Sequence, residues 1–303
     1  MADLVGRQLG HYRLTRLLGR GGFADVYLGE QIYLGSRAAI KVLSAPLAQE
    51  AASGFLNEAR TLVRLAHPHI IRLLDYGVQE QMPFLVMEYA PGGTLRERHP
   101  GGQRLPLPTV VDFVKQVAEA LQHAHKGRLI HRDVKPANLL LGQRGEILLS
   151  DFGIALFAHS TRSQRTEEIV GTISYMAPEQ IQGRPCQASD QYALGVIVYE
   201  WLTGKRPFSG SYPEIAAQHC LASPPPLRGA HPGIPQAVAA VVLRALAKSP
   251  QQRFASVQAF ARALEQAAAT TRSQSALLTM AEARPESRSR WRLEDDLEGV
   301  STW

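Results

Sequence analysis

A run of closely spaced glycines near the N-terminus constrains the fold of this chain more than any other feature. The stretch LGRGGFADVYLG covers residues 18–29; it contains Gly19, Gly21 and Gly22, with Ala24 where G-x-G-x-x-G would have its third glycine. Glycines at this spacing let backbone amides come close to phosphate groups, because no Cβ intervenes. Two arrangements use such a loop: a turn from a strand into a helix, and a hairpin between two strands.

The residues that follow the glycines favour the hairpin. A dinucleotide-binding turn requires a helix directly after the glycines and an acidic residue about 20 positions further on. Here the segment from Asp25 to Leu28 is typical of a strand, and the next strand, AAIKVL, carries Lys41 and no acid. The sequence therefore predicts a strand, a glycine loop and a second strand, followed by a strand that bears a lysine.

Hydrophobic patterns divide the chain into a strand-rich first part and a helix-rich second part. The glycine hairpin and its neighbours predict three strands over 12–43, a helix over 47–66, and two more strands in IIRLLDYG and PFLVMEY. After the connector APGG (90–93), helices are expected from Thr109, with Asp112 near its first-turn amides, to Gly127, and over about 190–203, 236–248 and 256–269. A proline-rich loop is expected at 222–235, and the aperiodic residues after 269 predict a mobile tail.

Composition excludes several classes of protein. The chain is 45% hydrophobic, which is typical of a globular protein, and its net charge of +6 over 303 residues is too small to predict a nucleic-acid partner. The two cysteines, Cys186 and Cys220, do not have the spacing of a metal site, and they do not form the pattern of a disulfide framework. The first residues do not resemble a secretion signal, and no apolar run reaches membrane-spanning length. If the chain is the whole gene product, we expect a cytoplasmic protein without a membrane segment.

Two polar stretches in the second part decide between the remaining possibilities: HRDVKPANLL (131–140) and SDFGIA (150–155). Together with the glycine loop, AIK and APE (177–179), they resemble the eukaryotic-type protein kinase family, and EQI and PPPLR are most like its bacterial Ser/Thr members. The resemblance covers about residues 10–268 and implies an α+β, two-lobed fold. It implies the following division: an extension (1–10), a kinase domain (11–268) with a β-rich lobe (11–88), a hinge (89–93) and a helical lobe (94–268), and a tail (269–303).

The resemblance also assigns roles in phosphoryl transfer, which requires the phosphoryl group to be held in line and its charge neutralised. Asp133 would orient or accept the proton of the substrate hydroxyl, a contribution of about 10²–10⁴-fold. Lys135 would contact the γ-phosphate or that hydroxyl, with Thr172 packed beside it, which favours Ser/Thr substrates. Asn138 and Asp151 offer the hard oxygen ligands that Mg²⁺ or Mn²⁺ prefers.

ATP is the cofactor that the resemblance implies. Lys41 would bind its α- and β-phosphates, with Glu58 as the expected ionic partner, ahead of Glu50, because a buried lysine without one is costly. Met87 would stand at the gatekeeper position. Glu88 and Ala90 would contact adenine through their backbone, and Val26, Ala39 and Leu140 would sandwich it; a plain core role is the less favoured alternative for these apolar side chains. The expected ATP contacts are Leu18, Gly19, Gly21, Gly22, Val26, Ala39, Lys41, Glu58, Glu88, Ala90, Leu140 and Asp151.

Other residues are expected to regulate or support the site. Arg132 precedes Asp133, and an arginine there indicates control by a phosphate, for which Thr166 is the expected autophosphorylation site; an ordinary loop hydroxyl is the alternative. Glu179 is expected to pair with Arg253. Two further residues have structural roles in this interpretation: Asp190 would orient the catalytic-loop backbone, and His131 would be a packed core residue.

Three functions remain open at this stage. The first is an active Ser/Thr protein kinase with protein substrates and possible self-association for autophosphorylation in trans. The second is a pseudokinase scaffold, which the intact Lys41, Asp133, Asn138 and Asp151 disfavour. The third is a small-molecule kinase, which usually lacks the DFG, the APE and the lysine two residues after the catalytic aspartate.

Overall fold

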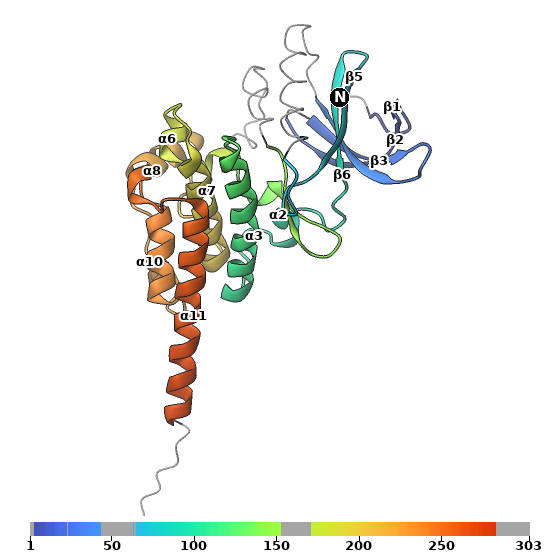
Figure 1. Cartoon of the computed structure of the whole chain (residues 1–303). Helices are drawn as coiled ribbons and strands as arrows, with labels where there is room; N and C mark the ends of the chain where they lie inside the picture. The colour runs from blue at the N-terminus through green and yellow to red at the C-terminus, as the bar shows by residue number, and fades with distance from the viewer. Residues whose placement is uncertain (1–2, 23, 44–62, 64, 153–170, 283–303) are drawn as a thin grey trace, which may run out of the picture.

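The computed structural model describes residues 3–22, 24–43, 63, 65–152 and 171–282. Most of the predicted helix over 47–66, including Glu58, lies outside the described residues, as does Thr166. Within the described part, a β-rich lobe and a helical lobe lie side by side (Figure 1). This arrangement is the predicted α+β, two-lobed fold.

The β-rich lobe is built on one antiparallel sheet with the strand order β1-β2-β3-β4-β6-β5. The glycine loop joins β2 to β3 as predicted, and the register pairs Val26 both with Gly19 and with Lys41. Side chains alternate across the sheet, so Lys41 lies on the face opposite Ile40. The strands are β1 (Gln8–Leu9), β2 (Tyr12–Arg20), β3 (Ala24–Gln31), β4 (Arg37–Leu43), β5 (Leu73–Gln79) and β6 (Met82–Glu88).

The helical lobe surrounds α7 (Gln187–Thr203), which is buried at every position from Ser189 to Thr203. Apolar residues predominate on every side of α7, and such a helix is typically buried; α3 (Leu107–Lys126), α10 (Gln236–Ala245) and α11 (Val257–Glu282) pack against it. The shorter elements are α2 (Leu95–Arg98), η1 (Pro136–Asn138), β7 (Leu139–Leu141), β8 (Ile147–Leu149), α6 (Pro178–Ile181), α8 (Tyr212–Leu221), α9 (Leu227–Ala230) and η2 (Pro250–Gln252).

Helix ends differ from the sequence-based prediction. Helix α3 begins at Leu107 and not at Thr109, because proline is tolerated in a first turn; Val110 N donates to Pro106 O at 3.0 Å. Asp112 is therefore not the N-cap, which is Pro106, and its carboxylate accepts from Gln116 Nε2. Helix α7 starts before residue 190, and the proline-rich loop contains α9. Helix α11 continues past 269 to Glu282, because no proline or glycine interrupts this stretch.

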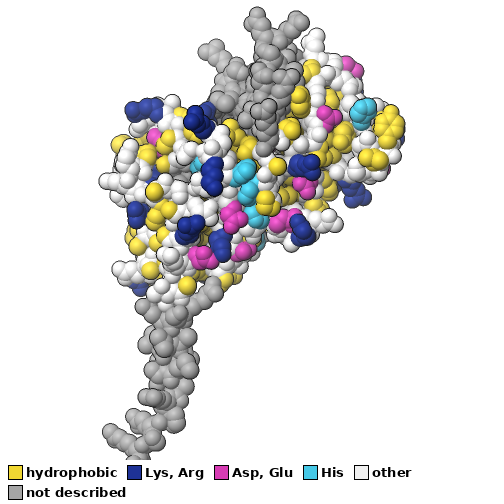
Figure 2. All heavy atoms as spheres, in the orientation of Figure 1, with side chains coloured by type: hydrophobic (Ala, Val, Ile, Leu, Met, Phe, Trp, Pro, Cys, Tyr) yellow, Lys and Arg dark blue, Asp and Glu magenta, His cyan; other side chains and the backbone are white. Residues whose placement is uncertain are grey.

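Surface charge follows the modest net charge of the chain. Figure 2 shows Lys and Arg side chains standing among acidic and apolar ones on the face that it presents, without a single basic band. Within the part of the chain that the structure describes, no helix is both long enough and apolar enough to cross a bilayer. The expected absence of a nucleic-acid partner stays a prediction.

Candidate active site

A cleft of about 1220 Å³ brings together residues from both lobes. It collects the glycine loop, β4, the loop that leads into β7 and the segment that follows β8. Nine predicted site residues line it: Gly19, Gly21, Gly22, Val26, Lys41, Asp133, Lys135, Asn138 and Asp151. The other expected adenine contacts do not line this cleft; they lie in β2 (Leu18), in β4 (Ala39), at or just after the end of β6 (Glu88, Ala90) and in β7 (Leu140).

The Asp133 carboxylate is held by two neighbours on its own loop. Asn138 Nδ2 donates to Asp133 Oδ2 at 3.0 Å and to the Asp133 carbonyl oxygen at 2.7 Å. Lys135 Nζ lies 2.9 Å from Asp133 Oδ2 and donates to Thr172 Oγ1 at 3.0 Å. Asp133 and Lys135 both keep about a fifth of their side-chain surface exposed (20% and 21%), so a substrate hydroxyl can reach them. The carboxylate is thus oriented and paired with a cation.

The backbone beneath this loop is fixed by Asp190 from α7. Its two oxygens accept from the amides of His131 and Arg132, each at 2.9 Å, and Gln180 Nε2 donates to the Arg132 carbonyl oxygen at 2.6 Å. These contacts on both sides hold Arg132 at φ 68°, a left-handed conformation that costs about 1–3 kcal/mol outside glycine. The predicted role of Asp190 is confirmed.

His131 is fully buried, as predicted for a structural histidine. Its Nδ1 accepts from the amide of Asp133 at 3.2 Å, so the ring proton is on Nε2, which lies 2.8 Å from the carbonyl oxygen of Ser150. The ring also packs against Phe152, with centroids 4.5 Å apart. His131 therefore joins the catalytic loop to the Asp151 strand end without reaching the cleft.

Asp151 pairs with Lys41 across the two lobes, with Lys41 Nζ 2.7 Å from Asp151 Oδ1. Burial alone would raise the pKa of Asp151, but the positive charges of Lys41 and Lys135 outweigh it, and the net pKa is lowered. Asp151 is therefore ionised at neutral pH. With the amide nitrogen of Asn138 turned to Asp133, its amide oxygen and the Asp151 carboxylate form a donor set of hard oxygens that fits a divalent cation.

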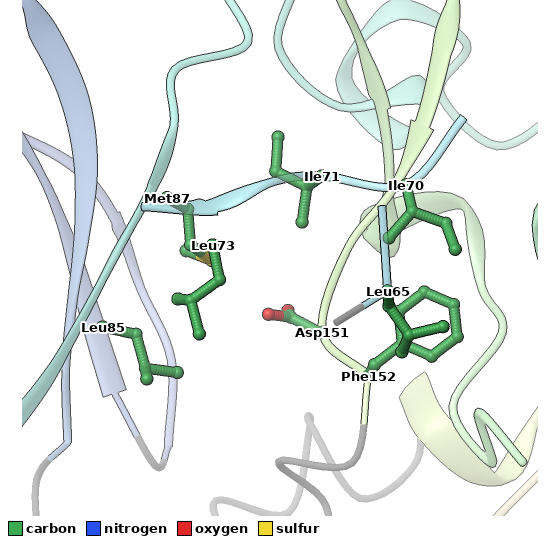
Figure 3. A pocket seen from close by; sticks show the side chains of 8 residues that line it. All are labelled: Leu65, Ile70, Ile71, Leu73, Leu85, Met87, Asp151 and Phe152. Carbon is green, nitrogen blue, oxygen red and sulfur yellow. The ribbon is translucent and has the colours of Figure 1, made fainter. Parts of the chain in front are cut away.

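A narrow apolar pocket lies behind this ion pair (Figure 3). Leu73, Leu85 and Met87 from β5 and β6 form one side, and the Asp151 carboxylate points toward them. Phe152 stands on the other side and is almost fully buried. Met87, the predicted gatekeeper, thus lines this pocket. The apolar side chains around Asp151 exclude water from its carboxylate, which is why burial alone would raise its pKa.

Glu179 and Arg253 form the predicted buried ion pair. Arg253 Nη1 and Nη2 each donate to a different oxygen of Glu179 at 2.8 Å, and the Arg253 side chain is completely buried. Burial would raise the pKa of Glu179, but the hydrogen bonds from Arg253 and Ser189 lower it overall. The pair connects α6 to the segment before α11, away from the reacting groups.

Five residues at the helical-lobe end of the cleft were not found from the sequence. They are Arg96, Tyr175, Glu200, Lys205 and Arg206. Each is ordinary in its local sequence, and only the folding of α2, α7 and the segment before α6 places them together. No spacing or periodicity signals such a group.

Comparison with known proteins agrees with this geometry. Residues 12–264 match the protein kinase domain family. The chain belongs to the protein kinase family. Members of this family use ATP and a divalent cation in general, so the donor set of Asn138 and Asp151 lies where a kinase requires one.

Three curated relatives of this kinase domain are bacterial, as the sequence indicated. It is 38% identical over 256 residues to the serine/threonine-protein kinase PrkC of Bacillus subtilis, which covers 83% of this chain and 40% of PrkC. It is 43% identical over 277 residues to Pkn1 of Myxococcus xanthus, 88% of this chain and 39% of Pkn1. It is 39% identical over 254 residues to PknB of Mycobacterium tuberculosis, 80% of this chain and 40% of PknB. The chain thus spans about 40% of the length of these relatives.

Proposed function

We propose that the chain transfers the γ-phosphoryl group of ATP to serine and threonine hydroxyls of proteins. The observation that carries this proposal is the Asp133 carboxylate, held by Asn138 and Lys135 in the cleft that also contains the Lys41–Asp151 pair. The Lys135–Thr172 hydrogen bond supports Ser/Thr acceptors, as do the names of the relatives. Among the described contacts, no observation favours a scaffold or a small-molecule kinase.

Each group has one part in the transfer. The glycine-loop amides and Lys41 hold the phosphates, and Asn138 and Asp151 hold Mg²⁺, which when bound neutralises charge on the β- and γ-phosphates. Asp133 receives the hydroxyl proton as the hydroxyl oxygen bonds to the γ-phosphorus; the bond from that phosphorus to the β–γ bridging oxygen breaks, ADP leaves, and Lys135 balances charge beside Asp133. Glu58 remains the proposed partner of Lys41 once ATP is bound, and Leu18, Ala39, Glu88, Ala90 and Leu140 remain the proposed adenine contacts.

Activation belongs to the same proposal. Thr166 is autophosphorylated, in trans between two copies of the chain in the cytoplasm, and Arg132 binds the resulting phosphate. Mass spectrometry of active protein should find phosphate on Thr166, and Thr166→Ala should lower activity. An unmodified Thr166 together with full activity of Thr166→Ala would contradict this part alone.

Transfer of ³²P from [γ-³²P]ATP to a protein substrate tests the proposal. We expect it to require Mg²⁺ and to fall at least about 100-fold in Asp151→Asn, because the cation then loses a charged ligand. Labelling that survives both EDTA and Asp151→Asn would show that this cleft does not perform the transfer.

The glycine loop gives a second expected result. Gly21→Val should weaken ATP binding by more than about tenfold, equivalent to about 1.4 kcal/mol, because a branched side chain then stands where the phosphates approach. Ala24→Gly should change it by only a few-fold, since Ala24 is buried in β3 and the Gly21 amide already closes the loop onto its carbonyl oxygen at 2.9 Å. Titration with a fluorescent ATP analogue measures both; a large effect of Ala24→Gly would show that the third loop position matters more than we infer.

A further inference from the structure

The helical-lobe end of the cleft carries a group of charged side chains beyond Asp133. Arg96 comes from α2, Glu200 from α7, and Lys205 and Arg206 from the residues just after Gly204, the C-cap of α7; all four line the cleft. Asp133 lines the same cleft, so a peptide whose hydroxyl reaches Asp133 lies in the cleft that this group lines. The charges of this group that are not already paired therefore affect which peptides can bind.

Glu200, the acidic member of this group, is already neutralised. Arg96 Nη1 lies 3.0 Å from Glu200 Oε1, and Arg96 Nη2 lies 3.3 Å from Glu200 Oε2. The Tyr175 hydroxyl donates to Glu200 Oε2 at 2.5 Å, and only 8% of the Glu200 side chain is exposed. A carboxylate with a two-point arginine contact and a further donor has little capacity left for a substrate cation.

Lys205 and Arg206 are in the opposite situation. In the described ranges, neither has an acidic side chain within ion-pair distance. Lys205 is exposed, and Arg206 Nη1 donates to the neutral hydroxyl of Ser174. The charge of both side chains is thus available to a ligand in the cleft.

The position of Arg206 relative to the reacting group is fixed by the loop that it contacts. That loop begins at Thr172, which accepts from Lys135 beside Asp133, and the carbonyl oxygen of Ser174 lies 3.1 Å from Nε2 of the buried His219. The guanidinium therefore contacts a segment only two residues from the catalytic lysine's partner. Arg206 and Asp133 both line the same cleft.

We propose that this end of the cleft selects acidic peptides, in which a glutamate or aspartate close to the acceptor serine or threonine pairs with Arg206 and Lys205. The inference rests on the proposed function and adds the substrate class to it. Opposite charges across an interface give selectivity by attracting one partner and repelling the other. A lysine in the same place of the peptide meets the charges of Lys205 and Arg206, and among the described residues at this end of the cleft the Glu200 carboxylate is already paired with Arg96.

Three peptides that differ only in the residues flanking one threonine test this proposal: glutamate, glutamine or lysine. We expect kcat/KM to be about three- to tenfold higher for the glutamate peptide than for the glutamine peptide, and lower by a similar factor for the lysine peptide. The preference should shrink as salt is raised from 0.05 to about 0.5 M, because screening weakens exposed pairs. Equal values for the three peptides, or a preference indifferent to salt, would overturn the proposal.

Substitutions of Lys205 and Arg206 test whether these two residues cause the preference for acidic peptides. In Lys205→Gln/Arg206→Gln, the glutamate-to-glutamine ratio of kcat/KM should fall toward one, whereas Arg37→Gln/Arg262→Gln, which removes two exposed charges elsewhere, should keep the wild-type ratio. Arg96→Gln should raise the lysine-to-glutamine ratio, because it releases the Glu200 carboxylate. A ratio unchanged in the first variant would overturn the proposal.

Failure of the inference and failure of the proposed function give different results. If the glutamine and glutamate peptides are phosphorylated with equal kcat/KM, only the proposed acidic preference is wrong. If no peptide is phosphorylated, the kinase proposal is wrong. Fluorescence anisotropy with labelled glutamate and lysine peptides then still tests whether the cleft prefers acidic ligands. Tighter binding of the glutamate peptide supports the preference, and equal binding overturns it.

Discussion

Replacing Asp133 by asparagine is expected to lower kcat for peptide phosphorylation by about 10²–10⁴-fold, because the amide cannot accept the hydroxyl proton. The affinities for ATP and peptide should change by only a few-fold. The fold should persist, since the loop backbone is held by Asp190 and Gln180 through His131 and Arg132, without help from the Asp133 side chain.

Asp112→Asn is the matched control for this variant. Asp112 is an exposed carboxylate on α3 whose described hydrogen bond is to Gln116, so the same chemical change there should leave kcat within about twofold. Steady-state kinetics and a thermal melt of both variants separate catalysis from folding. If Asp133→Asn kept more than a third of the wild-type kcat while Asp112→Asn behaved as wild type, Asp133 would not be the catalytic base.

Arg253→Met is expected to lower the free energy of unfolding by about 3–5 kcal/mol, because it leaves the Glu179 carboxylate buried without its counter-charge. The guanidinium also donates to the carbonyl oxygens of Ala188, Ala247 and Lys248, which would all lose a partner. Urea unfolding followed by circular dichroism measures the loss. Activity should fall only in proportion to unfolding, since the pair does not line the cleft.

An exposed ion pair provides the comparison. Arg7 and Glu80 approach to 2.6 Å, but their side chains are 45% and 60% exposed, so Arg7→Met should cost less than about 1 kcal/mol. The pKa of Glu179 is lowered from 4.5 in the folded chain, so its ion pair stabilises above that pH and this contribution is lost as the pH falls through the folded pKa. The difference in free energy of unfolding between wild type and Arg253→Met should therefore become smaller at acidic pH. If Arg7→Met and Arg253→Met lowered the free energy of unfolding equally, the argument from burial would be refuted.

The strands around the glycine loop and the main catalytic residues could be predicted from short stretches of sequence. The branched and aromatic residues of ADVYLGEQ and RAAIKVL predicted β3 and β4, and the DFG and HRD stretches predicted the site roles of Asp151 and Asp133, which line one cleft. Helix ends were less predictable, because Pro106 and Pro108 are compatible both with a loop and with a first helical turn. The start of α3 was decided by packing of its apolar face.

The charges at the far end of the cleft could not be predicted at all. Arg96 and Glu200 are 104 residues apart, and neither has a local partner that marks it as part of a site. Their neutralisation of each other depends on how α2 docks against α7, which is a property of the tertiary structure. The same holds for the availability of Arg206, which depends on the absence of a nearby acid among the described residues.

Phosphoamino-acid analysis of a protein substrate, incubated with ATP and Mg²⁺ and either the wild-type chain or Asp133→Asn, tests the central claim most directly. The account predicts phosphoserine and phosphothreonine with the wild type and almost none with the variant. Phosphotyrosine as the main product, or equal labelling by the two proteins, would contradict it.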